Sequence, residues 1–347
     1  MQKYEQQAEE LFAALQAGNE DAQWRVKWEH PCFRGKSIED VRADPLDLDD
    51  ARMVVAQQQS FNSWEELRAF VNDQSVAEFE EAVEAVVGGD AEKLRTLLQA
   101  NPELVRARST RRHHSTLLHY IGANGVEGQR QKTPKNAVEI TKLLLDAGAD
   151  PDAVADLYDH QCTTMSMLVS SSHPHEAGLQ VALAETLLDY GASLDGVGTN
   201  WESAVLTALQ FGYLDTARAL AARGVRLDFI MYAGLGDRDA VARLLPDADA
   251  DSRQKALALA AQHGHADVVR LLVDAGADPN GYNPEGYHSH TTPLHQAVWA
   301  NHMEVVRLLV ERGARLDQKD TLYSGTPLAW AIYGKRDEIA AYLRELV

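Results

Sequence analysis

The sequence predicts an all-α solenoid, a fold in which short helix pairs stack on one another, preceded by a helical cap. A recurring closing pattern is the first observation: LLLDAGADPD (143–152), LLDYGASLD (187–195), LAARGVRLD (220–228), LLVDAGADPN (271–280) and LLVERGARLD (308–317). The apolar residues before these closings recur at helical spacing, which is the second observation. A single unit of this kind cannot bury its apolar faces alone, so copies that recur in register indicate stacking.

The most regular unit is TTPLHQAVWANHMEVVRLLVERGARLD, residues 291–317. Thr292 is suited to cap a first helix, and Pro293 suits its first turn, where no amide donor is needed. Gly313 suits the end of a second helix, where the backbone adopts a conformation that other residues resist. One apolar face of each helix is formed by Leu294, Ala297 and Val298, and by Val305, Val306, Leu308 and Leu309.

This unit closely resembles the ankyrin repeat, with its Thr-Pro-Leu-His start and its Gly-Ala close. The resemblance covers roughly residues 79–347, as about eight repeats that begin near Phe79, Thr116, Thr163, Ser203, Phe229, Lys255, Thr292 and Thr326. It implies that β-turn loops and first helices line a concave face, the usual binding surface of the family. It also implies that His119 and His295 bridge backbone groups of adjacent repeats.

Residues 1–75 do not resemble an ankyrin repeat, and we assign the array to residues 76–347. Helices are expected at about 3–17, 19–28, 47–58 and 63–73, the last begun by the capping-box pattern Ser63-Trp64-Glu65-Glu66. We expect this segment to cover the apolar edge of the first repeat, and the alternative is a separate partner-binding element. Its FNSWEEL stretch is similar to uncharacterised bacterial ankyrin-repeat proteins, a likeness that transfers no activity.

Two neighbouring repeats are enlarged between their helices. The distance from Gly125 to Gly148 is 23 residues, against 12 from Asn301 to Gly313 in the regular unit, so the insertion at 125–138 adds eleven. A second insertion at 172–178 adds seven by the same comparison. Because stacked repeats align equivalent positions, the two insertions are expected to lie side by side.

Positive charge gathers around the first insertion. Seven basic residues lie between Arg106 and Lys135, and only Glu127 opposes them. Arginine can bind a carboxylate or phosphate through two parallel hydrogen bonds. One hypothesis is therefore an anionic ligand or an acidic peptide held here, and the alternative is a solvated basic patch that pairs with nearby acidic helices.

Composition limits the classes of partner and compartment. The net charge of −19 opposes attraction to phosphate backbones, so we expect no nucleic acid. No apolar run approaches the ~20 residues that span a bilayer, so we expect no membrane partner. The acidic N-terminus differs from a signal peptide, and only Cys32 and Cys162 occur, which favours a reducing cytoplasm.

Catalytic and metal chemistry find weak support. His173 and His175, or His288 and His290, could ligate a metal, but chance explains such pairs, and we predict no metal or cofactor. Cys162 with His160 and His173 could supply a thiol and a base, although a small cysteine also packs well at the start of a helix. Motifs for nucleotide or acyl-transfer chemistry are missing, so we lean against an enzyme and leave the question open.

We predict a binding module for a protein or peptide partner, through the concave face and the enlarged repeats 113–178. The alternative is a small-molecule enzyme or sensor whose pocket is formed by the inserted loops, with an anion as one candidate ligand. For the aromatic residues the alternative is core packing. The predicted binding residues are Arg111, Arg112, His114, Tyr120, Asn124, Arg130, Lys132, Tyr158, Thr164, His173, Trp201 and Trp299.

Overall fold

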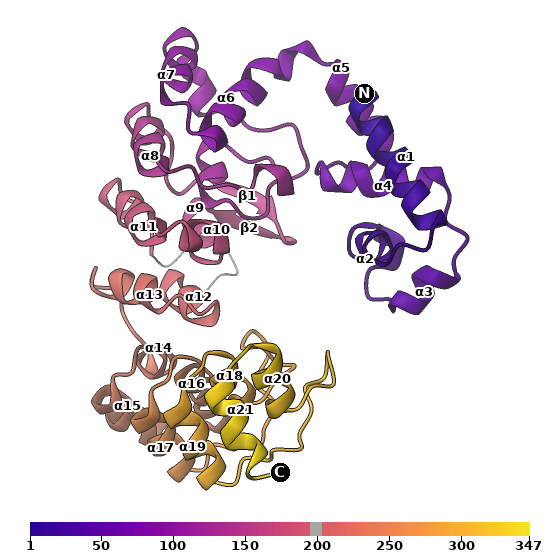
Figure 1. Ribbon diagram of the computed structural model, residues 1–347. Coiled ribbons are helices and arrows are strands. Elements are labelled where there is room, and N and C mark those ends of the chain that lie inside the picture. The colour runs from indigo at the N-terminus through magenta and orange to yellow at the C-terminus, as the bar shows by residue number, and fades with distance from the viewer. Residues whose placement is uncertain (195–202) are drawn as a thin grey trace. The chain divides into compact units, whose positions relative to one another are not determined.

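The computed structural model describes residues 1–194 and 203–347, and it is built almost entirely of helices (Figure 1). The all-α prediction is confirmed, since the described residues contain strands only in one short hairpin. The chain divides into two compact units, Met1–Trp201 and Glu202–Val347. The boundary predicted near residue 75 falls inside the first of them.

The first unit begins with a small helical bundle. Its helices are α1 (Gln2–Gln16), α2 (Glu20–Glu29), α3 (Ile38–Ala43), α4 (Leu48–Gln58) and α5 (Trp64–Asn72), with short 3₁₀ turns at η1 (Pro31–Phe33) and η2 (Gln74–Val76). Four of these helices match the predicted ranges, and α3 is additional. Ser63 caps α5 through the Glu66 amide at 3.1 Å, as predicted, while the Glu66 carboxylate bonds to the Asn62 amide. Leu11, Val26 and Leu67 lie in the apolar core of the bundle.

Three helix pairs complete the first unit. They are α6 (Ala77–Gly88) with α7 (Ala91–Ala100), η4 (Leu117–Gly122) with α8 (Ala137–Asp146), and α9 (Thr164–Val169) with α11 (Gln180–Asp189). The connections carry η3 (Pro102–Val105), η5 (Gly128–Arg130) and α10 (Ser172–Glu176). Strands β1 (Val154–Leu157) and β2 (His160–Thr163) pair antiparallel in the turn before α9. First helices contact first helices along the stack, and second helices contact second helices (Figure 1).

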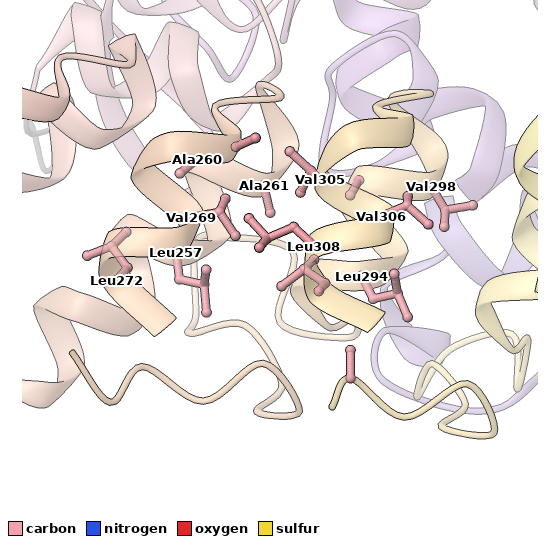
Figure 2. Packing of buried hydrophobic residues seen from close by; sticks show 14 of the residues in the cluster. Leu257, Ala260, Ala261, Val269, Leu272, Leu294, Val298, Val305, Val306 and Leu308 are labelled. Carbon is pink, nitrogen blue, oxygen red and sulfur yellow. The ribbon is translucent and has the colours of Figure 1, made fainter. Parts of the chain in front are cut away.

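The second unit continues the pattern with five more pairs. They are α12 (Ala204–Gln210) with α13 (Leu214–Ala221), α14 (Phe229–Leu235) with α15 (Arg238–Leu244), α16 (Ala250–Gln262) with α17 (Ala266–Asp274), α18 (Pro293–Trp299) with α19 (Met303–Glu311), and α20 (Pro327–Tyr333) with α21 (Asp337–Arg344). A 3₁₀ turn, η6 (Leu245–Asp247), follows α15. One apolar core runs from α14 to α21, and Figure 2 shows Leu257, Val269 and Leu294 within it.

Local chemistry explains why the regular repeat folds as predicted. Thr292 and His295 form a reciprocal capping box at the start of α18, and Gly313 takes a φ of 84° after α19. The Nε2 of His295 lies 3.2 Å from the Gly325 carbonyl oxygen of the next repeat. His119 lies 3.3 Å from the Cys162 carbonyl oxygen in the same way. The predicted bridging role of both histidines is therefore confirmed.

Candidate functional site

The two insertions of the first unit start beside each other. The Asn124 amide donates a hydrogen bond to the Ser170 hydroxyl at 2.9 Å, and the Ser171 hydroxyl donates to the Ala123 carbonyl at 3.0 Å. These bonds join the residues directly before each insertion. The expected adjacency of the enlarged connections is thus present at their bases.

The first insertion turns sharply at Gly125. Its φ of 71° favours glycine, and an added Cβ would lie 2.9 Å from the Leu157 side chain of β1. The neighbouring Tyr158 hydroxyl donates to the Asn124 side-chain oxygen at 2.5 Å. The β1–β2 hairpin, which we did not predict from the sequence, therefore packs directly on the insertion.

Beyond this turn the insertion carries a carboxylate into the interior. The Glu127 side chain is 0% exposed and contacts the Arg111 guanidinium, which is 2% exposed. A second guanidinium, from Arg130, lies 3.3 Å from the same Glu127 oxygen and 2.7 Å from Glu80 of α6. Arg111 also bonds to Glu80, at 2.8 Å. Four charged side chains thus neutralise one another where water is excluded, as buried charges must.

Arg111 links this cluster to the N-terminal bundle. Its Nη1 donates to the Gln59 carbonyl oxygen at 2.7 Å, and its guanidinium carbon lies 4.4 Å from the centre of the Phe70 ring. The backbone amide of Arg112 donates to the Ser60 carbonyl at 3.0 Å. The cluster therefore holds the bundle, the loop before η4 and the insertion together.

The environment favours the charged form of Glu127. Burial alone would raise the pKa of this carboxyl. The polar contact with His113, whose Nε2 lies 3.7 Å from the carboxylate, and the charges of Arg111 and Arg130 outweigh that effect, and they lower the pKa to about 2. The carboxylate is consequently ionised throughout the neutral range.

Several predicted binding residues are occupied by this internal structure. Arg111 and Arg130 are buried in ion pairs, and Tyr120 is buried beside them, where burial first and the Glu127 charge second raise the pKa of its hydroxyl. Thr164 is fully buried in α9. Their side chains are therefore turned away from any external ligand.

The other predicted residues do not converge on one pocket. His114 pairs with Asp156 at 2.9 Å, while Lys132 and His173 are exposed at separate places. Trp201 lies outside the described residues. The Cys162 thiol is buried and directed at the Leu157 carbonyl oxygen 3.6 Å away, which suits packing rather than attack on a substrate.

Arg112 and Tyr158 do line a cleft of about 840 Å³ within the first unit. Its walls come from α1, α2, the end of α4 and residues 125–131, and they are rich in side-chain amides such as Gln59 and Gln129. Arg112 donates to the Gln57 side-chain oxygen at 2.7 Å. Burial first, and the nearby Arg34 charge second, lower the pKa of its guanidinium. Burial raises the pKa of Glu29 in the same cleft, against the opposing charges of Arg112, Arg25 and Arg34.

A second and more apolar hollow lies in the second unit, with a volume of about 980 Å³. We call it the aromatic groove, and its lining comprises Phe211, Gly212, Leu214, Gln262, His263, His288, His290, Gln296, Trp299, Ala300, His302, Tyr323, Gly325, Ala329, Trp330 and Tyr333. The residues come from the ends of α12, α16, α18 and α20 and from the loops that precede α18 and α20. No aspartate, glutamate, lysine or arginine belongs to this lining.

Large rings are exposed in this groove. Trp299 is 44% exposed, Tyr323 76% and Tyr333 82%. The rings of Trp299 and Tyr333 are nearly parallel, with centres 6.4 Å apart, whereas Trp330 stands at 76° to Trp299 with centres 5.7 Å apart. Exposed aromatic rings grouped in a hollow are typical of recognition surfaces.

A buried carboxylate fixes the orientation of Trp330. Asp320 accepts hydrogen bonds from the Trp330 indole at 2.9 Å and from the Gly325 and Tyr323 amides at 2.7 Å and 2.6 Å. Although burial opposes it, this set of hydrogen bonds holds the pKa of Asp320 below its usual range. The floor of the groove is therefore pre-organised.

Two histidines of the groove bridge neighbouring repeats. His263 and His302 lie 2.8 Å and 3.0 Å from the carbonyl oxygens of Leu209 and Gln262 in neighbouring repeats. Burial lowers the pKa of His263 to about 4, so this ring is neutral near pH 7. Across the described residues, no group of three or more histidine, cysteine or carboxylate side chains is arranged to hold a metal.

Sequence reasoning identified Trp299 and missed Tyr323, Trp330 and Tyr333. The sequence did contain one feature that indicates Tyr333. Tyr333 follows Thr326 by seven residues, just as Trp299 follows Thr292, so the two rings occupy equivalent positions in adjacent repeats. An exposed aromatic residue that recurs at one repeat position indicates a surface rather than a core.

Comparison with known families agrees with the geometry. A family model described as ankyrin repeats, in three copies, matches residues 229–320 and 290–346. The match covers most of the second unit and most of the residues that line the aromatic groove. No curated protein matches the chain. Within the described ranges, no helix is both long and apolar enough to cross a membrane.

Proposed function

Because residues 229–346 are ankyrin repeats, we propose that this protein is a recognition module that binds a segment of a partner protein in the aromatic groove. The observation that carries the proposal is the gathering of the exposed rings of Trp299, Tyr323 and Tyr333 in one hollow. Tryptophan and tyrosine are the residues that most often dominate binding energy at protein interfaces.

Rigidity supports the same proposal. Trp299, Trp330 and Tyr333 stand on short helices that pack into one apolar core, and Asp320 fixes Trp330. A surface that is already ordered loses little conformational entropy when it binds, so more of the contact energy appears as affinity. That the enlarged repeats 113–178 set specificity stays a prediction.

A selection experiment tests this proposal. Random short peptides displayed on phage would be selected against the full chain, and the enriched peptides titrated against three proteins. We expect equal affinity for the wild type and for Trp28→Ala, which removes an exposed tryptophan (67%) of α2 that does not line the groove. We expect affinity about tenfold or more weaker for Trp299→Ala, in line with the loss of an interface hot spot.

The opposite result would remove the groove from the function. If the enriched peptides bind Trp299→Ala as tightly as the wild type, recognition takes place elsewhere. Circular dichroism and the thermal midpoint of each variant show whether the fold is retained. Because Trp299 is partly exposed, its replacement should leave the core intact.

A second candidate function is the binding of a small anionic ligand in the cleft of the first unit. It is supported by the guanidiniums of Arg25 and Arg112, which line the cleft together with the carboxylates of Glu10, Asp21 and Glu29. Among the described residues, neither guanidinium has a carboxylate oxygen within 4 Å, and both act electrostatically on Glu29. Thermal-shift measurements with small carboxylates and phosphates would test it. Anion binding in the cleft is supported if an anion raises the thermal midpoint of the wild type and of Arg106→Gln but not of Arg112→Gln. It is excluded if no anion raises the thermal midpoint of the wild type.

We also propose the cytoplasm as the compartment of the protein. Neither Cys32 nor Cys162 is bound in a disulfide, which suits a reducing environment. Fractionation of the source cells, followed by immunodetection, would test this assignment.

A further inference from the structure

We infer that the segment bound in the aromatic groove is uncharged, rich in proline and extended in the polyproline II conformation. This inference rests on the proposed function and adds the chemistry of the partner to it. Three properties of the groove lead to it: the charge of its lining, the hydrogen-bond donors on its walls, and the spacing of the helices that it crosses.

Two charged groups touch the lining, and both are already engaged: Asp320 accepts from the Trp330 indole, and Arg336 donates to the Trp299 carbonyl oxygen. The sixteen lining residues themselves include no lysine, arginine, aspartate or glutamate, and His263 is neutral near pH 7 because it is buried. A charged side chain placed here would lose hydration and gain no free opposite charge. Specificity by charge complementarity therefore favours an uncharged segment.

The walls offer donors and no strand edge. The described residues of the second unit contain no strand, so a peptide cannot bind by extending a sheet. An amphipathic helix needs a continuous hydrophobic groove, whereas two glutamines and four histidines interrupt the apolar residues of this lining. The groove is therefore poorly suited to a peptide bound as an added strand or as an amphipathic helix.

A polyproline II segment, by contrast, binds through hydrogen-bond donors and aromatic faces, and the groove supplies both. A segment in this conformation makes no internal hydrogen bonds, so its carbonyl oxygens are free to accept hydrogen bonds from a binding surface. The indole nitrogen of Trp299 and the hydroxyls of Tyr323 and Tyr333 have no hydrogen-bond partner within the described residues. Proline rings pack on aromatic faces, and Trp299 and Tyr333 present two nearly parallel ones.

The repeat spacing matches as well. Polyproline II advances about 9 Å per turn of three residues. Neighbouring packed helices lie about 8–10 Å apart, and the groove crosses consecutive first helices α16, α18 and α20. Residues three apart in the segment would therefore reach successive first helices.

Two measurements test the inference. The first is the composition of the peptides that depend on Trp299 in the selection described above. The second is a titration, followed by tryptophan fluorescence, of the full chain with an oligoproline peptide of about ten residues, which spans about 30 Å. A glycine-serine peptide of equal length is the matched control.

We expect the selected peptides to be enriched in proline and depleted in charge. We expect the oligoproline to bind the wild type and Trp28→Ala equally, and Trp299→Ala about tenfold or more weakly. Tyr333→Phe, which keeps the ring and removes only the hydroxyl, should weaken binding about three- to tenfold, the usual effect of losing one hydrogen bond.

The outcomes separate the inference from the proposed function. Peptides that need Trp299 but lack proline, or carry charge, would overturn the inference and leave the groove as a recognition site. Enriched peptides that bind equally well without the Trp299 ring would overturn both. Equal quenching by the oligoproline and by the glycine-serine control would also overturn the inference.

Discussion

Glu127 and Arg111 form an ion pair from which water is excluded, with their side chains 0% and 2% exposed. Glu127 comes from the insertion at 125–138, and Arg111 from the loop that also contacts the N-terminal bundle through the Gln59 carbonyl. The insertion therefore supplies a structural anchor. Its cationic composition is explained in part by Arg130, which pairs with Glu127 and Glu80 rather than with solvent.

Replacing Glu127 should destabilise the first unit severely. Glu127→Ala leaves two buried guanidiniums without their shared carboxylate, and breaking a buried ion pair from one side typically costs about 3–5 kcal/mol. Urea denaturation followed by circular dichroism would measure the free energy of unfolding. Glu92→Ala is the matched control, because the Glu92 side chain is 88% exposed and should change stability by less than about 1 kcal/mol. Equal stability of the two variants would contradict the anchor.

The same carboxylate should make stability fall in acid. The pKa of Glu127 is about 2 in the folded chain and about 4.5 in the unfolded chain, so the unfolded state binds a proton first as the pH falls. This contribution is fully present above about pH 5 and is lost as the pH approaches 2. In Glu127→Gln, stability should depend less steeply on pH over that window. Equal slopes for wild type and variant, from denaturation at several pH values, would argue against a depressed pKa.

His263 predicts a loss of stability at milder pH. Burial lowers its pKa from 6.5 to about 4. Below pH 6.5, His263 is therefore protonated in the unfolded chain while it is still neutral in the folded chain. Stability should therefore fall between about pH 6.5 and 4, by up to about 3 kcal/mol from this group. His263→Gln can still donate to the Leu209 carbonyl and does not titrate, so its stability should fall less over this interval. A variant with an unchanged pH profile would contradict the assignment.

Asp320 should control the shape of the aromatic groove. Asp320→Ala removes the acceptor of the Trp330 indole and of three backbone amides, at a cost of about 2–4 kcal/mol, since hydrogen bonds to a buried charged group are strong. Tryptophan emission should shift to longer wavelength as the Trp330 ring becomes mobile and hydrated. Asp317→Ala, in an exposed pair with Arg315, is the control and should leave the spectrum unchanged. An unshifted Asp320→Ala spectrum would show that Trp330 is held by other contacts.

Local patterns predicted most of the fold. The Thr292–His295 capping box, the closing glycines and the histidine bridges depend on residues within one repeat or between adjacent ones, so they can be read from a single sequence. The hairpin β1–β2 could not be predicted in this way, because its strands are four residues each and depend on packing against residues 113–125.

The site was less accessible to sequence reasoning. Seven basic residues around the first insertion suggested an anion site, but Arg111 meets Glu80 across 31 positions of the chain and Arg130 meets Glu84 across 46. Such pairings depend on tertiary structure and leave no local pattern. Part of the aromatic groove, in contrast, could be predicted from the sequence, because Trp299 and Tyr333 occupy equivalent positions in adjacent repeats.

The most direct test of the central claim is a crystal structure of the full chain with the tightest peptide from the selection. We predict density for an extended backbone across the rings of Trp299 and Tyr333, with the Tyr333 hydroxyl bonded to a peptide carbonyl. A peptide bound elsewhere, for example in the cleft beside Arg112, with the aromatic groove open to solvent, would contradict the account.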